Sequence, residues 1–428
     1  MLSQTSNRPY WWLDAPRPSE THIAQPAKVD VAIVGAGFTG LNTALVLARA
    51  GLSVAVFEAG QLGEGASSRN GGMVGPSFHK LGIAGLRAKY GFERTDDIIR
   101  ESLGFVGYLD DFLKAEEIDA EFIRNGRFRG ALLPKHYDDM QRQLESLQET
   151  CGVEGAMVAQ KDMAAETGSK RFFGGVTYET DGGLHPAKYL DGLAKRVSSA
   201  GAQILPYTPV TDIEKVSGVY TLTSPKGKTG ATNIAICTNA YSEKGFANLR
   251  RRVLPLRSAM IATAPIDPAL MGRLMPKGRM YGDSRRIVAY YRPSPDGTRI
   301  LFGGRATGIR EDALRNAKQL RTSMVEIYPE LREVPIDNIW SGLVAYTFDH
   351  APHIGQREGL FYAMGYCGSG VARASYFGNK LGHKILGDNE SSTAFDDLEF
   401  EMKPFYSGNP WFMPAVLNWH RLADRLGM

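Results

Sequence analysis

The sequence predicts an α/β fold in which two separated strand, glycine-turn and helix units enclose a region of antiparallel strands. The first unit covers residues 29–58 and the second covers 360–387. Between them, residues 212–237 and 286–303 show the alternation and turn signals of antiparallel strands. With 428 residues and 43% hydrophobic composition, the chain can bury cores for two or three domains.

The first unit carries a glycine motif that is typical of dinucleotide binding. The motif, residues 35–40, follows the apolar run 29–34 and precedes a predicted helix over 41–50. Gly35 makes a tight turn, Gly37 lets the backbone approach a pyrophosphate, and Gly40 lets the helix pack against the strand. Glu58 ends the next strand about 20 positions after Gly37, the spacing of a carboxylate that binds ribose hydroxyls. The acid would repel a 2′-phosphate, so the motif disfavours NADP.

Two segments near this unit lack regular periodicity. The glycine-rich loop 63–73 contains one cation, Arg69, and few side chains obstruct its backbone, so we predict that it runs along a cofactor. The first 28 residues contain Trp11, Trp12 and several prolines. They predict an extended arm that packs its aromatic rings on the body of the protein or on another subunit.

The rest of the chain predicts further helices and strands. We expect helices over 93–116, 137–150, 186–200 and 311–327, and strands over 202–205, 286–292 and 299–303. The second glycine turn, 365–371, leads into a helix that Gly387 ends. In a doubly wound NAD dehydrogenase the two nucleotide-binding halves follow each other closely. The wide separation here instead indicates a flavin enzyme, with a substrate domain inserted into the FAD domain.

Composition excludes several other classes. The net charge of +4, from 50 basic and 46 acidic residues, does not predict a nucleic-acid partner. The three cysteines lie far apart, which predicts no disulfide framework and a cytoplasmic location. No apolar run reaches the roughly 20 residues of a membrane span, and no signal peptide is evident. We interpret His350 and His353, the closest histidine pair, as hydrogen-bonding residues and predict no metal site.

In these motifs the chain resembles the glycine/D-amino-acid oxidase (DAO) family of FAD enzymes, and in particular its branch that contains gamma-glutamylputrescine oxidase. The matching segments occur in family order and are 31–58, 65–72, 183–186, 237–241, 301–304, 340–342, 349–355 and 365–371. The resemblance implies a Rossmann-like FAD domain built from 29–80, 183–245 and 335–390. It implies a substrate domain with a large antiparallel sheet built from 81–182 and 246–334, flanked by an arm over 1–28 and a tail over 391–428.

The resemblance also implies which residues bind FAD. They are Gly35, Gly37, Phe38, Thr39, Gly40, Glu58, Ala59, Ser67, Ser68, Arg69, Asn70, Gly71, Gly72, Met73, Val210, Thr238, Asn239, Gly368, Ser369, Gly370 and Val371. Among them, Glu58 is expected at the adenosine ribose and Val210 at the adenine. The 368–371 turn is expected at the pyrimidine end of the flavin, where the following helix N-terminus would stabilise negative charge.

The chain departs from its relatives at functional positions. Ser369 stands where relatives often carry the His of a Gly-His-Gly turn. Sarcosine-oxidase relatives attach FAD through a Cys before a Tyr-Thr pair, whereas residues 344–347 contain no Cys. We therefore predict non-covalent FAD. No Lys matches the one that such relatives use for reaction with oxygen, so the electron acceptor, oxygen or another compound, stays open.

The reaction implied is oxidation of a C–N bond of an amine or amino acid. Hydride would pass to flavin N5, and the resulting imine would hydrolyse. The protein needs no strong base, only a site that lowers the pKa of the amine by burial or by cationic neighbours. The candidate substrate-site residues are Tyr291, Arg305, Tyr346, His350 and Tyr366, with Arg292 beside the first. An Arg facing the flavin would suit a substrate carboxylate.

Several alternatives remain open at this point. The substrate is a gamma-glutamylputrescine-like or related amine, or instead an opine or another N-substituted amino acid. The chain could also be the flavin subunit of a larger oxidase complex, or form an oligomer, through the aromatic arm and the tail that contains Trp411 and Trp419. A tRNA-modifying protein would need a basic surface and a methyltransferase module, and the sequence shows neither.

Overall fold

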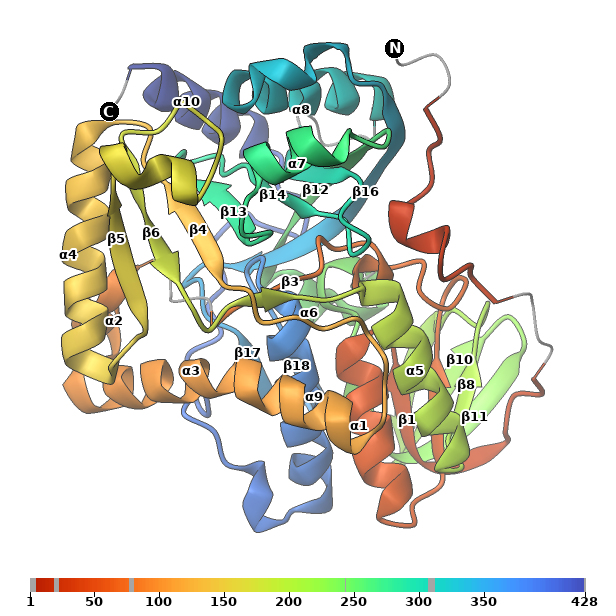
Figure 1. The fold of residues 1–428 in the computed structure, drawn as a ribbon. Helices are drawn as coiled ribbons and strands as arrows, with labels where there is room; N and C mark the ends of the chain where they lie inside the picture. The colour runs from red at the N-terminus through yellow and green to blue at the C-terminus, as the bar shows by residue number, and fades with distance from the viewer. Residues whose placement is uncertain (1–4, 19–22, 77–80, 243, 307–311, 427–428) are drawn as a thin grey trace.

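A computed structural model describes residues 5–18, 23–76, 81–242, 244–306 and 312–426 (Figure 1). It contains two large sheets, each of eight strands, and a two-stranded sheet. In Figure 1 one large sheet, with β4, β13, β14, β12 and β16, occupies the upper half of the view, and the other, with β1, β8, β10 and β11, lies below it. The described helices do not include one that is long and apolar enough to cross a membrane.

The lower sheet is the predicted nucleotide-binding sheet. Its strand order is β17-β18-β11-β1-β2-β8, and β10 and β9 continue antiparallel from β11. Its strands are β1 (Lys28–Val34), β2 (Val54–Phe57), β8 (Gln203–Leu205), β9 (Asp212–Val216), β10 (Val219–Ser224), β11 (Gly227–Ile236), β17 (His353–Arg357) and β18 (Leu360–Met364). The parallel strands β1 and β2 are almost wholly buried, because both faces of such a sheet are covered.

Four helices share a core with this sheet. They are α1 (Phe38–Arg49), α3 (Phe92–Ala115), α5 (Pro186–Ser199) and α9 (Gly370–Leu386). Leu41 of α1, Phe105 of α3, Leu193 of α5 and Phe377 of α9 belong to one buried cluster with Val31 and Ile33 of β1. A second cluster joins other β1 residues to β10 and to α6 (Ala247–Arg250). The helices therefore hold the carboxyl end of β1, where the glycine turn begins, in a fixed place.

The upper sheet has the order β16-β12-β15-β14-β13-β4-β6-β5 and is antiparallel except between β13 and β4. Its strands are β4 (Arg127–Gly130), β5 (Gly155–Ala159), β6 (Gly174–Tyr178), β12 (Val253–Thr263), β13 (Met280–Asp283), β14 (Tyr290–Pro293), β15 (Ile300–Arg305) and β16 (Ile336–Thr347). One face packs on α7 (Pro268–Leu274) and α8 (Ala313–Ile327). Helices α2 (Gly82–Tyr90) and α4 (Pro134–Cys151) pack near β5 and β6.

Short elements and the chain ends complete the fold. The two-stranded sheet joins β3 (Met73–Val74) to β7 (Gly182–Gly183). The 3-10 turns are η1 (Tyr10–Trp12), η2 (Ala66–Ser68), η3 (Gln160–Ala165), η4 (Asn239–Tyr241), η5 (Lys244–Phe246), η6 (Pro329–Glu333) and η7 (Asn389–Ser391). The arm pairs Ser6 with Asn338 beside β16, and the tail ends in α10 (Met413–Leu426).

The structure differs from the sequence-based predictions in the placement of β16 and α3 and in where one strand begins. β16, assigned to the FAD domain, pairs with β12 along its length and so belongs to the upper sheet. α3, assigned to the substrate domain, shares its core with α1 and α9. The strand expected over 286–292 begins only at Tyr290, because the Asp283 carboxylate accepts hydrogen bonds from the N–H groups of Arg285 and Ala289 and so closes a loop.

Candidate active site

A cavity of about 1080 Å³ is lined by both large sheets. On one side it is bounded by the glycine turn after β1, by loop 63–73 and by the turn before α9. On the other side it is bounded by one face of the upper sheet and by the loop after β13. The two predicted glycine turns, far apart in the sequence, thus meet at one cavity.

The first glycine turn has the geometry that the motif predicts. Gly35 has φ +104°, and a Cβ there would lie 2.9 Å from the Cys237 carbonyl oxygen. A Cβ on Gly40 would lie 1.9 Å from the Gly35 carbonyl oxygen. Gly40 does not line the cavity; its role is to let α1 pack close to the turn, as the motif predicts.

Two helices begin at the cavity, and in neither does the residue before the helix provide a side-chain cap. Gly37 precedes α1 and Ser369 precedes α9, and neither provides a capping hydrogen bond. By contrast, the side chains of His185, Asp267 and Asp312 cap α5, α7 and α8. The remaining free N–H groups and the helix dipoles of α1 and α9 suit anionic groups of a ligand. The predicted positions of the pyrophosphate at α1 and of the flavin pyrimidine at α9 stay predictions.

Glu58 stands at the end of β2, held by the backbone beside the first glycine turn. Its carboxylate accepts hydrogen bonds from the Ala36 N–H at 2.9 Å and from the Gly60 N–H at 3.3 Å. Burial raises the pKa of this carboxyl, and the backbone hydrogen bonds oppose that shift. A fixed carboxylate at this point of the cavity matches the ribose-binding role.

The loop after β2 is anchored to the start of α1 and to three tryptophans. Ser67 Oγ accepts a hydrogen bond from the Phe38 N–H at 3.1 Å. The indole N–H groups of three tryptophans donate to the next three residues of the loop. These bonds are Trp12 to Ser68 Oγ at 2.9 Å, Trp340 to the Arg69 carbonyl at 2.7 Å and Trp11 to the Asn70 carbonyl at 2.8 Å. The arm therefore packs on its own chain and fixes this loop.

Most of the predicted cofactor residues line the cavity. Those that do are Gly35, Gly37, Phe38, Thr39, Glu58, Ala59, Ser67, Arg69, Asn70, Gly71, Met73, Val210, Thr238, Asn239, Gly368, Ser369, Gly370 and Val371. Ser68 and Gly72 join Gly40 outside the lining. Ser68 is fully buried, and its hydroxyl donates to the Gly63 carbonyl. The Gly72 carbonyl accepts from Arg292 at 3.1 Å. These two residues hold the loop rather than face the cavity.

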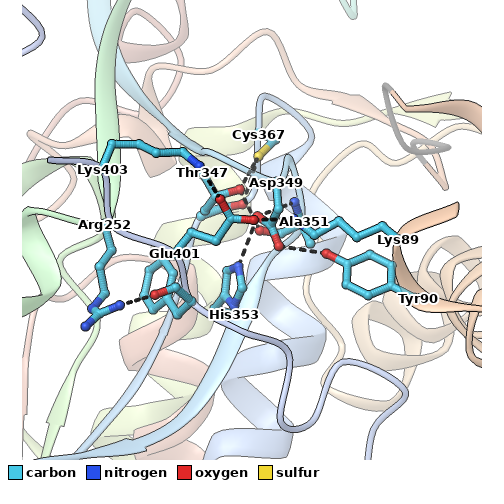
Figure 2. A network of polar contacts seen from close by, with 12 residues as sticks. Lys89, Tyr90, Arg252, Thr347, Asp349, Ala351, His353, Cys367, Glu401 and Lys403 are labelled. Carbon is cyan, nitrogen blue, oxygen red and sulfur yellow. Dashed lines mark hydrogen bonds and ion pairs between the residues drawn. The ribbon is translucent and has the colours of Figure 1, made fainter. Parts of the chain in front are cut away.

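The turn before α9 is held by a buried polar network, shown in Figure 2. The Thr347 hydroxyl lies 3.4 Å from Cys367 Sγ and donates to the Ala351 carbonyl at 2.8 Å. Asp349 then accepts from Tyr90 Oη at 2.8 Å and lies 3.1 Å from His353 Nε2. Burial alone would raise the pKa of Asp349, but the hydrogen bonds from His353 and Tyr90 lower it. The carboxylate thus ties α2 to the segment behind the turn.

The opposite wall of the cavity is one row of residues across the upper sheet. Paired residues on neighbouring strands point to the same face. The row consists of Trp340, Met260, Gly303, Tyr290, Gly282 and Arg129. A Cβ on Gly71 would lie 3.2 Å from the Tyr290 ring. The middle of the row therefore lies against the loop that we expect at the flavin.

The position of Tyr291 corrects a sequence-based prediction. Tyr291 is fully buried and stacks between Tyr281 and Phe302, with ring centroids 5.4 and 5.2 Å away. It lies on the face that packs on α8 and does not line the cavity. Tyr290, whose hydroxyl lies 3.0 Å from Ser258 Oγ, faces the cavity instead. Arg292 is fully buried and bonds to the Leu184 carbonyl at 2.9 Å, a structural position.

The other candidate substrate-site residues line the cavity. The Arg305 guanidinium lies over the Tyr346 ring at 4.6 Å, and the His350 ring meets the same ring edge-on at 5.9 Å. Tyr366 is almost fully buried, and its hydroxyl lies 2.7 Å from Thr39 Oγ1. That hydrogen bond links the two glycine turns, so Tyr366 holds them together as well as lining the cavity.

Sequence reasoning missed several cavity residues, among them Arg127 and Arg129. They flank Phe128, which is buried on the opposite face of β4. The alternation of two arginines around a phenylalanine is the signal that could have found them, because a strand with one buried face alternates in this way. Arg127 pairs with Asp181 at 2.8 Å.

Comparisons with known proteins agree with this site. The model of the DAO family, described as FAD dependent oxidoreductase, matches residues 30–383. The chain belongs to this family. FAD is therefore its cofactor, and the uncapped helices, the glycine turns and Glu58 form a site that fits FAD. The assignment also confirms the predicted fold class and makes the chain an FAD-dependent oxidoreductase.

Individual relatives in the DAO family extend over nearly the same length. A probable oxidoreductase OrdL of Haemophilus influenzae is 30% identical, over 88% of this chain and 87% of its own. A gamma-glutamylputrescine oxidoreductase of Escherichia coli is 28% identical, over 93% of each chain. The crystal structure of glycine oxidase from Geobacillus kaustophilus has the same fold, with a TM-score of 0.73, 22% identity and coverage of 89% and 99%.

Proposed function

We propose that the protein oxidises the C–N bond of an extended amine such as gamma-glutamylputrescine. One observation carries this choice: the cavity does not end at the glycine turns but continues along the upper sheet to Arg127 and Arg129. The cavity of about 1080 Å³ also has to hold FAD. The extension of its lining beyond the cofactor loop, and not its volume alone, therefore favours a substrate longer than a small amino acid. The gamma-glutamylputrescine oxidoreductase relative supports the same choice.

Bound FAD supplies the hydride acceptor, and this chain's residues supply position and environment. Tyr290, Tyr346 and Met260 form an apolar and aromatic wall opposite loop 63–73, which keeps water from the reacting carbon. The neighbouring cation Arg305 and this burial both lower the pKa of a substrate amine, which favours its neutral, reactive form. The imine product hydrolyses to a carbonyl compound and an amine or ammonia.

The alternative substrate is an opine or another N-substituted amino acid. Arg305 favours it, because an arginine within the cavity can bind a carboxylate next to the oxidised carbon. The two candidates give different products. An opine would release a keto acid or glyoxylate, whereas a gamma-glutamylated diamine would release an aminoaldehyde derivative.

Anaerobic mixing tests the proposal. The purified flavoprotein is mixed with gamma-glutamylputrescine, putrescine, opines, and D- and L-amino acids, and absorbance is followed between about 380 and 460 nm. We expect gamma-glutamylputrescine to bleach the flavin fastest, and the admission of air then shows whether oxygen is the acceptor. Faster bleaching by an opine would replace the first candidate by the second. A flavin that no amine bleaches would contradict amine oxidation.

A further inference from the structure

Arg129 is one of the cations of the cavity wall that have no carboxylate partner among the described residues. Arg129 lies on β4, and its one hydrogen bond there runs from Nε to the Asp283 carbonyl at 3.4 Å. Part of its surface stays accessible, yet burial lowers the pKa of the guanidinium. Both properties are those of a side chain deep in the protein that faces an internal cavity. Its terminal N–H groups are therefore available to a ligand.

Two aspartates that line the same cavity are already paired with other arginines. Asp181 pairs with Arg127 at 2.8 Å, and Asp283 pairs with Arg285 at 2.6 Å. Both aspartates are almost fully buried. Arg285 also lies 3.3 Å from Glu326, so Arg127 and Arg285 are both matched by carboxylates and Arg129 is not. A buried cation without a partner costs folding free energy, which a bound anion would offset.

The C-terminal helix contributes to the same cavity. Asp424 of α10 accepts hydrogen bonds from the Arg286 N–H at 2.9 Å and from the Ile287 N–H at 3.3 Å, in the loop that follows β13. His420, one turn earlier on α10, lines the cavity, and its Nδ1 has no hydrogen-bond partner within the described chain. A second polar group thus faces the cavity from the helix that docks on this loop.

The register of the sheet sets the distance from Arg129 to the reacting centre. Arg129 pairs with Gly282, and Gly282 pairs with Tyr290, which lies against Gly71. Two strand spacings separate Arg129 from Tyr290, about 10 Å. An extended ligand chain covers that distance in about nine bonds. A shorter ligand suffices where the Arg129 side chain reaches toward it. A ligand between the two points would span roughly four to nine bonds.

We propose that Arg129 binds a carboxylate of the substrate that is remote from the oxidised C–N bond. The substrates are then amines that carry an anion roughly four to nine bonds from the oxidised carbon, and unmodified polyamines are excluded because they lack the anion that Arg129 would bind. This inference rests on the proposed amine oxidation and narrows its substrate class. A gamma-glutamylated diamine meets the requirement, and so does an N-substituted amino acid with a long acidic arm.

Removal of the carboxylate charge tests the inference in turnover. The rate of anaerobic flavin reduction is measured with gamma-glutamylputrescine and with its carboxyl methyl ester, or with the same pair made from whichever amine reduces the flavin. In the wild-type holoenzyme we expect kcat/KM to be at least about tenfold higher for the acid. Arg129→Met should remove this preference for the acid, because it lowers kcat/KM for the acid and leaves kcat/KM for the ester unchanged. Arg129→Lys should restore part of the preference. The matched control Arg142→Met, at an exposed position on α4, keeps the preference.

Binding and stability give readouts that do not require turnover. Glutarate is titrated into the holoenzyme by calorimetry, and we expect at least tenfold weaker binding to Arg129→Met. The variant should unfold at the same or a higher temperature than the wild type, because it loses an unpaired buried charge. A purely structural arginine would show the opposite, a lower melting temperature with unchanged glutarate affinity.

The outcomes separate this inference from the proposed function. If an amine reduces the flavin but its acid and ester react equally, or if Arg129→Met keeps the preference, the inference is wrong and amine oxidation stands. If no amine reduces the flavin, the proposed function fails, and the glutarate titration alone decides the anion site. Loss of glutarate binding in Arg305→Met but not in Arg129→Met would place the anion at Arg305 and overturn the inference.

Discussion

Adjacent residues in the cavity wall have opposite environments. Tyr290 faces the cavity, and Tyr291 packs in the aromatic row of the opposite face. Because side chains alternate along a strand, a shift of one residue exchanges a buried core position for a site position. Both tyrosines suit a strand equally, so their identity alone could not assign the faces.

The two tyrosines provide a matched pair of variants. We expect Tyr290→Phe to lower kcat/KM for the best amine substrate about fivefold, since a hydroxyl hydrogen bond contributes about 1 kcal/mol. Tyr291→Phe should stay within about twofold of the wild type, because its ring does not line the cavity. Steady-state kinetics with equal flavin content checks both. Loss of activity only in Tyr291→Phe would contradict the assignment of the faces.

His185 makes stability depend on pH. It is fully buried, its Nδ1 accepts from the Lys188 N–H at 3.2 Å, and burial lowers its pKa to about 4. An unfolded histidine has a pKa of about 6.5. Between these values the unfolded chain binds the extra proton, so stability is complete above about pH 6.5 and falls as the pH falls toward 4.

Urea unfolding of the holoenzyme at pH 7, 6 and 5 measures this effect. By pH 5 the histidine should have cost the wild type about 2 kcal/mol of its free energy of unfolding. His185→Asn keeps a residue that caps helices well but does not titrate. Between pH 7 and pH 5 the free energy of unfolding of this variant should therefore fall by about 2 kcal/mol less than that of the wild type. Parallel curves for the two proteins would show that His185 does not titrate as described.

The N-terminal arm is an element whose role depends on contacts and not on its own secondary structure. Trp11 and Trp12 lie in the short turn η1, and their indole N–H groups bond to residues 70 and 68 of the cofactor loop. Trp11 is fully buried within its own chain, whereas Trp411 and Trp419 of the tail are exposed. The arm thus stabilises the cofactor loop by these contacts. Oligomer formation through the tail stays a prediction.

Loss of the arm hydrogen bonds should weaken FAD binding. Trp11→Phe and Trp12→Phe keep an aromatic ring but remove the donor, and each should raise the FAD dissociation constant about fivefold. Fluorescence titration of the flavin-free protein with FAD measures the change. Trp411→Phe, at an exposed position, is the matched control and should leave the constant unchanged. Equal constants for all three variants would show that the arm does not stabilise the loop.

At the scale of the whole molecule, the FAD site is assembled from segments of both large sheets that lie far apart in the sequence. The cavity is lined by the turns after β1 and β18, by the loop after β2 and by strands of the upper sheet. The network around Asp349 connects α2, β16 and the turn before α9. A ligand bound there contacts both large sheets, so its binding energy should stabilise their relative position.

Removal of FAD should therefore lower the stability of the whole chain. A ligand that binds only the folded state at about 1,000 times its dissociation constant adds about 4 kcal/mol. We expect the melting temperature to rise with the logarithm of added FAD. FMN should stabilise less, because it lacks the adenosine that we predict at Glu58 and Val210, both of which line the cavity. Acid precipitation should release the FAD, as non-covalent binding predicts. Identical melting curves with and without FAD would contradict this coupling.

The sequence by itself determined the local elements and the chemistry that depends on short spacings. The glycine turns, Glu58 and most helices depend on neighbours a few residues apart, and the family match confirms the FAD-binding fold that they predicted. Only the tertiary structure decided which sheet holds β16, which tyrosine faces the cavity, where the tryptophans donate, and that Arg129 lacks a carboxylate partner among the described residues. These features depend on strand pairing and on contacts between distant segments, and no local period in a sequence specifies either.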